Sequence, residues 1–323
     1  MVILSNMRLT IQHGETVFEP PILSGVTIER ERKGSPSVLT FTTVKIMNGG
    51  MDFSEGDAVC FYYNGEQVFM GYVFTKQRDK EHHIKVTCYD QMRYLKNNYT
   101  YIFQNKTASQ IIKAMCSDIN LKVGEFDDTK YIIPSLTEEN KSLLDISLSV
   151  LEDTLVHTGQ LYVLYDDFGQ LTLKNCKNMK SDVLIDATTA ENFDYSTSID
   201  KETYDSVMLY YKEDDHIVKI YHKQNEDRIK QWGLLRYYEE VDNKDIAENK
   251  AKQLLDLYCR KTRELKISKA FGHTSIRGGT LIPIRLNLGD IQVDNYFLVD
   301  KVVHNFEESH YTMDLTVSGA WDE

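Results

Sequence analysis

The sequence is poor in cysteine and proline, carries no surplus of positive charge and contains no long hydrophobic run. Its five cysteines lie far apart and form no Cys-x-x-Cys pair, which argues against a disulfide framework or a zinc cage and favours synthesis in a reducing cytoplasm. Lys and Arg number 37 against 49 Asp and Glu, a net charge of −12, whereas a protein that coats duplex nucleic acid needs a basic surplus. No stretch approaches the ~18 uncharged apolar residues of a membrane span, and the apolar start of the chain breaks early, so we expect neither membrane insertion nor a signal peptide.

Sequence patterns that would indicate catalysis or a cofactor are also absent. None of the nine histidines belongs to a His-Glu-x-x-His, His-x-His or His/Cys pattern. The adjacent His82 and His83 would face opposite sides of a strand, so they cannot share a metal ion. The acidic run at residues 213–215 lacks the spacing of a calcium loop and is better explained as a solvated turn. We therefore expect no catalytic, cofactor-binding or metal-binding residue, and no enzymatic activity.

The residues that are present predict a mainly β fold of the α+β class. The chain has 323 residues, of which 41% are hydrophobic, and at about 150 residues per domain this length suggests two or three domains. Aromatic residues that suit β-strands are plentiful, with 20 tyrosines and 13 phenylalanines, while only 5 prolines would interrupt pairing. The chain is therefore expected to be globular and rich in strands.

The first part of the chain, residues 1–98, reads as a β-domain. Met7–His13 alternates apolar and polar residues, which is typical of a half-buried strand. The dipeptide Asn64-Gly65 stands between two apolar runs and predicts a tight hairpin, because both residues tolerate the positive φ of a type I′ turn. A second hairpin is expected from Gly71 to Cys88, around a charged tip.

Residues 99–190 predict a separate α+β domain. Thr107 and Gln110 have the spacing of a capping box, so a helix should begin there. A second helix is expected to begin near Ser142 and to end at Gly159. From residue 191 to 323 the β-pattern resumes, with a helix at about 244–262 and a small insertion at about 213–243 as a further possibility.

The second hairpin of the first part has a counterpart near the end of the chain. Gly71–Asp90 can be laid over Asp300–Gly319 without a gap, which places Val73 on Val302. This predicts that the first and last parts are copies of one β-domain. The alternative, that two unrelated hairpins with charged tips match by chance, stays open at this point.

Two further correspondences lie upstream of the matched hairpins. Gly56-Asp57 has a counterpart in Gly289-Asp290, and the strand at 40–45 resembles residues 264–269. Two copies in one chain suit a ring, because three chains would then supply six similar units.

The most distinctive run of the chain is Val86-Thr-Cys-Tyr-Asp-Gln-Met-Arg-Tyr-Leu-Lys-Asn97, preceded by Gly71-Tyr-Val. Together with the closing hairpin it resembles the baseplate hub proteins of contractile phage tails and phage-derived tail particles, the defective-prophage type of Gram-positive bacteria. Arg228–Asn243 is the poorest match to this family. The motif residues taken from the resemblance and the duplication, all assigned a structural role, are Gly56, Asp57, Gly71, Tyr89, Asp90, Leu95, Gly289, Asp290, His304 and His310.

The resemblance implies a trimeric ring in which each chain contributes two tail-tube-like β-barrel domains with the α+β domain inserted between them. Such a ring would adapt the hexameric tail tube to the trimeric central spike. The implied partners are two further copies of the chain, the tail tube protein, the central spike protein, other baseplate proteins and the tape measure. The implied place of assembly is the bacterial cytoplasm, and the product is the baseplate of a virion or of a bacteriocin-like particle.

The charge adds one expectation to this reading, and two alternatives compete with it. In a phage, DNA would pass through the lumen of the ring, and an acidic lumen wall would repel its phosphates. The alternatives are a tail-associated cell-wall hydrolase, which requires a catalytic motif, and a carbohydrate-binding tail protein.

His304 and His310, on or beside a hairpin tip, are expected to be hydrogen-bonding turn residues.

Overall fold

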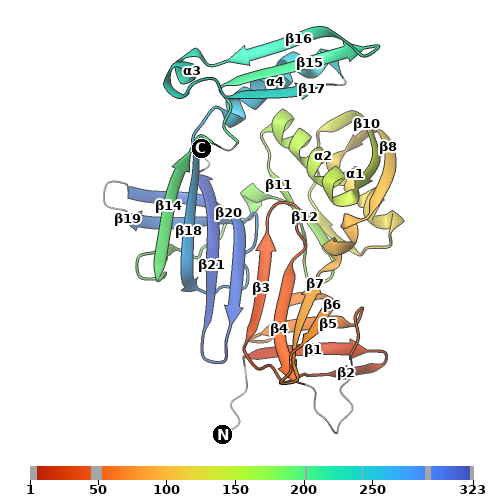
Figure 1. Cartoon of the computed structure of the whole chain (residues 1–323), viewed down its shortest axis with the longest axis vertical. Helices are drawn as coiled ribbons and strands as arrows, with labels where there is room; N and C mark the ends of the chain where they lie inside the picture. The colour runs from red at the N-terminus through yellow and green to blue at the C-terminus, as the bar shows by residue number, and fades with distance from the viewer. Residues whose placement is uncertain (1–5, 45–52, 201, 242, 288–291, 321–323) are drawn as a thin grey trace. The chain divides into compact units, whose positions relative to one another are not determined.

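The computed structural model describes residues 6–44, 53–200, 202–241, 243–287 and 292–320 (Figure 1). The chain divides into two compact units. Unit 1 comprises Met1–Leu151, Leu161–Asp194 and Leu265–Glu323, and unit 2 comprises Glu152–Gln160 and Tyr195–Glu264. Strands outweigh helices, as the sequence predicts, and the fold is mainly β with α+β character.

One large sheet contains both the first and the last strands of the chain. Its thirteen strands are β1 (Met7–His13), β2 (Thr16–Phe18), β3 (Val26–Glu31), β4 (Val38–Val44), β5 (Ala58–Tyr63), β6 (Glu66–Arg78), β7 (His83–Tyr89), β13 (Ile185–Asp186), β14 (Asn192–Ser198), β18 (Thr262–Phe271), β19 (Leu281–Asn287), β20 (Gln292–Phe306) and β21 (Tyr311–Ala320). The strand order is β14-β18-β21-β20-β3-β4-β7-β6-β5-β1-β2, with β19 beside β20 and β13 beside β19. In the part of the chain that the structure describes, the sheet does not close into a barrel. The two-barrel arrangement and the division at residues 98 and 190 therefore stay predictions.

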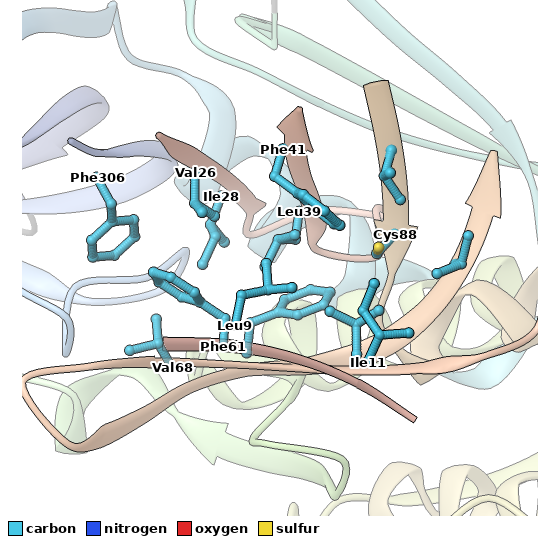
Figure 2. Close-up of a cluster of buried hydrophobic side chains, with 14 of the residues drawn as sticks. Leu9, Ile11, Val26, Ile28, Leu39, Phe41, Phe61, Val68, Cys88 and Phe306 are labelled. Carbon is cyan, nitrogen blue, oxygen red and sulfur yellow. The ribbon is translucent and has the colours of Figure 1, made fainter. Parts of the chain in front are cut away.

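The first half of the sheet folds over its own hydrophobic core (Figure 2). The Asn64-Gly65 hairpin forms as predicted, with positive φ of 51° and 83° at the two turn residues. Side chains from β3, β4 and β7 point toward those of β1, β5 and β6. The buried residues labelled in Figure 2 are Leu9, Ile11, Val26, Ile28, Leu39, Phe41, Phe61, Val68, Cys88 and Phe306.

An α+β part follows the first half of the sheet, and all of it except the end of its second helix, from Glu152 on, belongs to unit 1. Its elements are the short helix η1 (Gln91–Lys96), β8 (Asn98–Thr107), α1 (Ala108–Asp118), β9 (Val123–Phe126), β10 (Ile132–Ser142), α2 (Leu143–Thr158), β11 (Tyr162–Asp166), β12 (Leu171–Asn175) and the short helix η2 (Cys176–Asn178). The predicted capping box is present, because the Gln110 amide donates to Thr107 Oγ1 and the Gln110 side chain accepts from the Thr107 amide. Helix α2 begins after Ser142, whose hydroxyl accepts from the Asp145 amide at 3.1 Å.

Unit 2 is a small three-stranded sheet covered by one helix. Its elements are β15 (Ser206–Glu213), β16 (His216–Gln224), α3 (Glu226–Trp232), β17 (Arg236–Glu240) and α4 (Lys244–Tyr258), with strand order β16-β15-β17. The helix expected at about 244–262 is α4. It buries Ala247, Ala251 and Leu254 against Val207 and Leu209 of β15.

The first prediction concerns Gly71, which lies in β6 opposite Val59. A Cβ at this position would lie 2.3 Å from the carbonyl oxygen of Tyr89 and 2.7 Å from the Phe69 ring. We expect Gly71→Ala to lower the free energy of unfolding by about 1–3 kcal/mol, because backbone and ring must both shift. Urea denaturation would measure the loss.

Gly319→Ala is the matched control, because nothing lies within 4 Å of a Cβ at Gly319 in β21. We expect it to change the unfolding free energy by less than about 0.5 kcal/mol. Equal denaturation midpoints for the two variants would contradict the close approach of β6 and β7 at Gly71.

Candidate assembly interface

Two hairpins of the large sheet share an unusual pairing irregularity. In the β6–β7 hairpin Val73 pairs with Cys88 and Thr75 pairs with Thr87, so Phe74 is an extra residue and forms a β-bulge. The position of a bulge between two residue pairs is specific enough to identify equivalent hairpins.

The β20–β21 hairpin has the same bulge. Val299 pairs with Val317 and Lys301 pairs with Thr316, which leaves Asp300 as the extra residue. The bulges place Val73 on Val299 rather than on Val302, so the gapless match was wrong by three residues on this strand. It was right on the other strand, where Thr87 falls on Thr316. The cause is hairpin length, because β20 and β21 stay paired further beyond the bulge than β6 and β7 do.

The glycine that precedes each hairpin is also repeated. Gly56 has a φ of +95° and donates to the Val73 carbonyl at 2.8 Å, and the Asp57 carbonyl accepts from the Val73 amide at 2.9 Å. Gly279 has a φ of +93° and makes the same pair of bonds to Val299, at 2.8 and 2.9 Å, together with Thr280. The structural counterpart of Gly56-Asp57 is therefore Gly279-Thr280.

The predicted counterpart, Gly289-Asp290, lies outside the described residues. The sequence did contain a signal for the true position, because Arg277-Gly278-Gly279 has the composition of a turn. Asp57 has a local role as well: its carboxylate accepts from the Ser54 amide at 2.7 Å and lies 2.8 Å from His13 Nδ1.

The two halves of the sheet meet where β3 pairs with the far end of β20 (Figure 1). This antiparallel seam runs from Lys301 opposite Glu31 to Phe306 opposite Val26. Phe306 thereby enters the core of the first half, with its ring centroid 4.9 Å from that of Phe61.

Charged side chains of opposite sign reinforce the seam. Lys301 Nζ lies 2.6 Å from Glu29 and 3.1 Å from Glu31. Arg32 donates to the carboxylate of Asp300 at 2.6 Å, and its amide donates to the Asp300 carbonyl at 2.8 Å. The bulge residue Asp300 thus binds Arg32, which follows the last residue of β3, through both its side chain and its backbone.

A glycine permits the close approach of the two halves at this seam. A Cβ on Gly278 would lie 2.4 Å from the Arg32 amide nitrogen. Arg30 of β3 is buried nearby and donates to the carbonyls of Val68 and Thr274, one in each half of the sheet. Burial lowers the pKa of Arg30 to about 10, so it stays protonated at neutral pH.

The distinctive run around Asp90 connects the sheet to the α+β part. Asp90 is 1% exposed and accepts from the Met92 amide at 3.0 Å, which caps η1, and from the Ser37 amide at 2.8 Å. Leu95 is fully buried in the core of the α+β part. Tyr89 packs edge-on against Phe74, the bulge residue of β6. In the structure these motif residues have packing and capping contacts.

His304 is a core residue of β20 and not a turn residue. It pairs with Met313 and is fully buried. Its Nε2 donates to the Ile276 carbonyl at 2.9 Å, and its Nδ1 accepts from the Tyr311 hydroxyl at 2.8 Å. Burial lowers the pKa of His304 well below its usual range, so the ring is neutral. His310 does lie in the turn and is exposed, 3.1 Å from Glu307.

A second buried carboxyl group, which the sequence did not reveal, lies near Asp90. Asp166 ends β11 and accepts from the Gly169 amide at 2.7 Å. Burial raises the pKa of both Asp90 and Asp166, and the charge of Asp166 raises that of Asp90 further. Arg277 donates to the Asp166 carbonyl at 3.2 Å and to Asp167 at 3.1 Å. The turn after β11 is thereby tied to the second half of the sheet.

Asp79, Glu81 and His83, in and beside the β6–β7 turn, form the one metal-like cluster among the described residues, with ligand atoms within 4.8 Å of one another. Asp79 accepts from the amides of Glu81 and His83 at 2.8 and 3.0 Å, so the turn itself accounts for the grouping. The cysteines are unpaired, and Cys60 and Cys88 lie on strands β5 and β7. Among the described helices, none has the length and apolar character needed to cross a bilayer.

Comparison with known proteins identifies relatives over nearly the whole chain. Residues 26–318 match the model of the YQBQ-like family. The chain is 30% identical to the uncharacterized protein YqbQ of Bacillus subtilis (strain 168), covering 94% of each chain. It is also 30% identical to the phage-like element PBSX protein XkdQ of the same organism, covering 92% of each.

Solved structures with this fold include two tail proteins and a type VI secretion component. The 43 kDa tail protein of prophage MuSo2 from Shewanella oneidensis has a TM-score of 0.72 at 13% identity, over 96% of this chain and 98% of that one. The tail protein from Neisseria meningitidis MC58 has a TM-score of 0.73 at 11% identity, over 97% of each. The E. coli c3393 protein, described as a type VI secretion component similar to T4 tail proteins gp27 and gp5, has a TM-score of 0.56 at 12% identity, over 98% of this chain and 77% of that one.

The second prediction concerns the pH dependence of stability. The pKa of Asp90 is raised in the folded protein relative to the unfolded chain. Protonated Asp90 therefore contributes to the free energy of unfolding fully at pH values below its pKa in the unfolded chain, and this contribution is lost as the pH rises through its pKa in the folded protein. Asp90→Asn keeps an acceptor for the Met92 amide but cannot ionise. Between pH 5 and pH 8 we expect the wild type to lose on the order of 1–3 kcal/mol relative to this variant.

Urea denaturation of both proteins at several pH values would measure this difference. Asp227→Asn is the control, because Asp227 on α3 has a side chain that is 94% exposed. It should follow the wild type at every pH. Parallel stability curves for the wild type and Asp90→Asn would contradict the raised pKa.

Proposed function

The chain belongs to the YQBQ-like family, and from this membership we propose that it is the baseplate hub of a contractile phage tail or phage-like particle. Its relative XkdQ is a protein of a phage-like element, and two solved structures that share its fold are tail proteins. The hub is a structural protein and not an enzyme, and it works as a trimeric ring between the tail tube and the central spike.

The repeat inside the large sheet carries this proposal. The bulged hairpin and the positive-φ glycine before it occur once in each half of the sheet. A trimer of such chains has true threefold symmetry but presents six similar β-units. That combination lets one ring face a hexameric tube on one side and a trimeric spike on the other. In the ring the two halves act as tube-like β-barrel domains.

The partners follow from this place in the particle. They are the tail tube protein, the central spike protein, neighbouring baseplate proteins and the tape measure, and DNA passes only through the lumen. The similarity to a protein described as related to gp27 and gp5 supports a partner of the spike type. The net charge of −12 suits a lumen that repels phosphate. Assembly takes place in the bacterial cytoplasm.

The contacts of the buried acids support a structural protein rather than a hydrolase. Asp90 caps a helix and Asp166 closes a turn. Both carboxyl groups are buried, which keeps them away from a substrate in this arrangement.

The third prediction tests the ring. The purified full-length chain should sediment as a trimer and give threefold rings in negative-stain images. It should produce no clearing on a peptidoglycan zymogram, for which a lysozyme lane is the positive control. A protein that stays monomeric at every concentration reached, or that clears peptidoglycan, would overturn the proposed function.

A further inference from the structure

The long strand β20 has two neighbours along one of its edges. Up to Leu298 this edge pairs with β19. From Lys301 to Phe306 the same edge pairs with β3. The change of partner occurs at Asp300, the bulge residue.

The equivalent strand, β6, has only the first of these neighbours. Its edge pairs with β5 up to Tyr72, and Gly56 and Asp57 bond to Val73. Beyond the bulge at Phe74, the residues Thr75–Arg78 pair with β7 on their other side. Among the described strands, none pairs with their outer edge. This is the place that β3 occupies on β20.

The strand equivalent to β3 is β14. In the first half the order outward from the repeated hairpin is β7, β4, β3, and in the second half it is β21, β18, β14. The outer edge of β3 is paired with β20, whereas β14 is the last strand of the sheet. Among the described strands, the edge of β6 beyond the bulge has no partner strand and β14 has one unpaired edge, and they are the two sides of the same repeated contact.

Exposure and charge agree with this assignment. Strand β3 alternates buried and half-buried residues, while every residue of β14 except Tyr195 is exposed. In the internal seam a lysine of β20 meets two glutamates of β3. At the open places the signs are the same: Thr75–Arg78 contains two bases and no acid, and β14 contains Asp194 and no base. Of the two bases, Lys76 already contacts Glu55 at 3.8 Å and the Phe53 carbonyl within its own chain, so Arg78 is the base left for an incoming strand.

We propose that β14 of one copy pairs antiparallel with the outer edge of Thr75–Arg78 in β6 of the next copy. The contact repeats between chains the seam that β3 and β20 make within one chain. Because the two surfaces differ, the association is head-to-tail, and in the proposed trimer three such contacts close the ring. The inference rests on the proposed trimer and identifies the strands that hold it together.

The two seams differ at one point. By the repeated hydrogen bonds, Glu55 occupies the place of Gly278, and at Gly278 a Cβ would strike the backbone of Arg32. The incoming β14 must therefore leave the edge of β6 before it reaches Glu55. The contact between copies is confined to the stretch beyond the bulge.

Disulfide cross-linking of the full-length chain tests the pairing. Gln77→Cys in β6 is combined in turn with Ser196→Cys, Thr197→Cys and Ser198→Cys in β14; all four native residues are exposed. Mild oxidation should give covalent ladders up to the trimer. The yield should alternate along β14, because successive side chains of a strand point to opposite faces. Gln77→Cys with Val17→Cys is the matched control, since Val17 lies in β2 at the other end of the sheet.

The outcomes separate this inference from the proposed function. Trimers that form no β6–β14 cross-link, or that cross-link equally through β2, would overturn the strand assignment and leave the ring intact. A protein that is monomeric before any substitution would overturn the ring itself, and the strand pairing with it. Gln77→Cys alone gives the background from the native cysteines.

Charge reversal provides a test without new thiols. Arg78→Glu should weaken trimer formation in sedimentation experiments by roughly 2- to 5-fold per contact, and adding Asp194→Lys should restore it. Lys230→Glu makes the same change in net charge on α3, where the side chain is 75% exposed, and should have no effect. Equal effects of Arg78→Glu and Lys230→Glu would contradict the proposal.

Discussion

Strand β3 and the far end of β20 are separated by about 270 residues of chain, yet their pairing joins the two halves of the large sheet. Backbone hydrogen bonds supply the contact, and Lys301 between Glu29 and Glu31 selects the register. Phe306 is carried by the same strand into the core of the first half. Because a one-residue slip would turn that ring to the other face of the sheet, the seam and the core specify each other.

The α+β part depends on this seam indirectly, because it contacts both halves of the sheet that the seam joins. The turn after β11 is held by Arg277, which belongs to the second half of the sheet, while Asp90 at the start of η1 belongs to the first. Two buried carboxyl groups with raised pKa values therefore lie where three parts of unit 1 meet. Burying them is unfavourable unless the surrounding amides are in place, so they favour one arrangement of the three parts over others.

Local signals in the sequence predicted local structure well. The capping box at Thr107 and the Asn64-Gly65 hairpin are confirmed, because each depends on residues a few positions apart. The bulges at Phe74 and Asp300 left no such signal, and neither did the greater length of the second hairpin, which shifted the match on one strand by three residues. His304 was expected to be a turn residue, but it is a buried strand residue. The sequence around His304 does not show this, because its hydrogen-bond partners Ile276 and Tyr311 lie outside β20. The pairing of β3 with β20 could not be read from either strand alone.

Open strand edges ordinarily invite indiscriminate pairing, and the charges on these two edges oppose it. Two copies of the β6 edge brought together would place Lys76 and Arg78 against the same residues of the partner. Two copies of β14 would oppose Asp194 to Asp194. Only the mixed pair brings opposite signs together, and it is the pair that the internal seam already demonstrates with Lys301 and its two glutamates. Charge on the edges thus disfavours association through like edges, and it leaves the head-to-tail pairing of β6 with β14 as the favourable one.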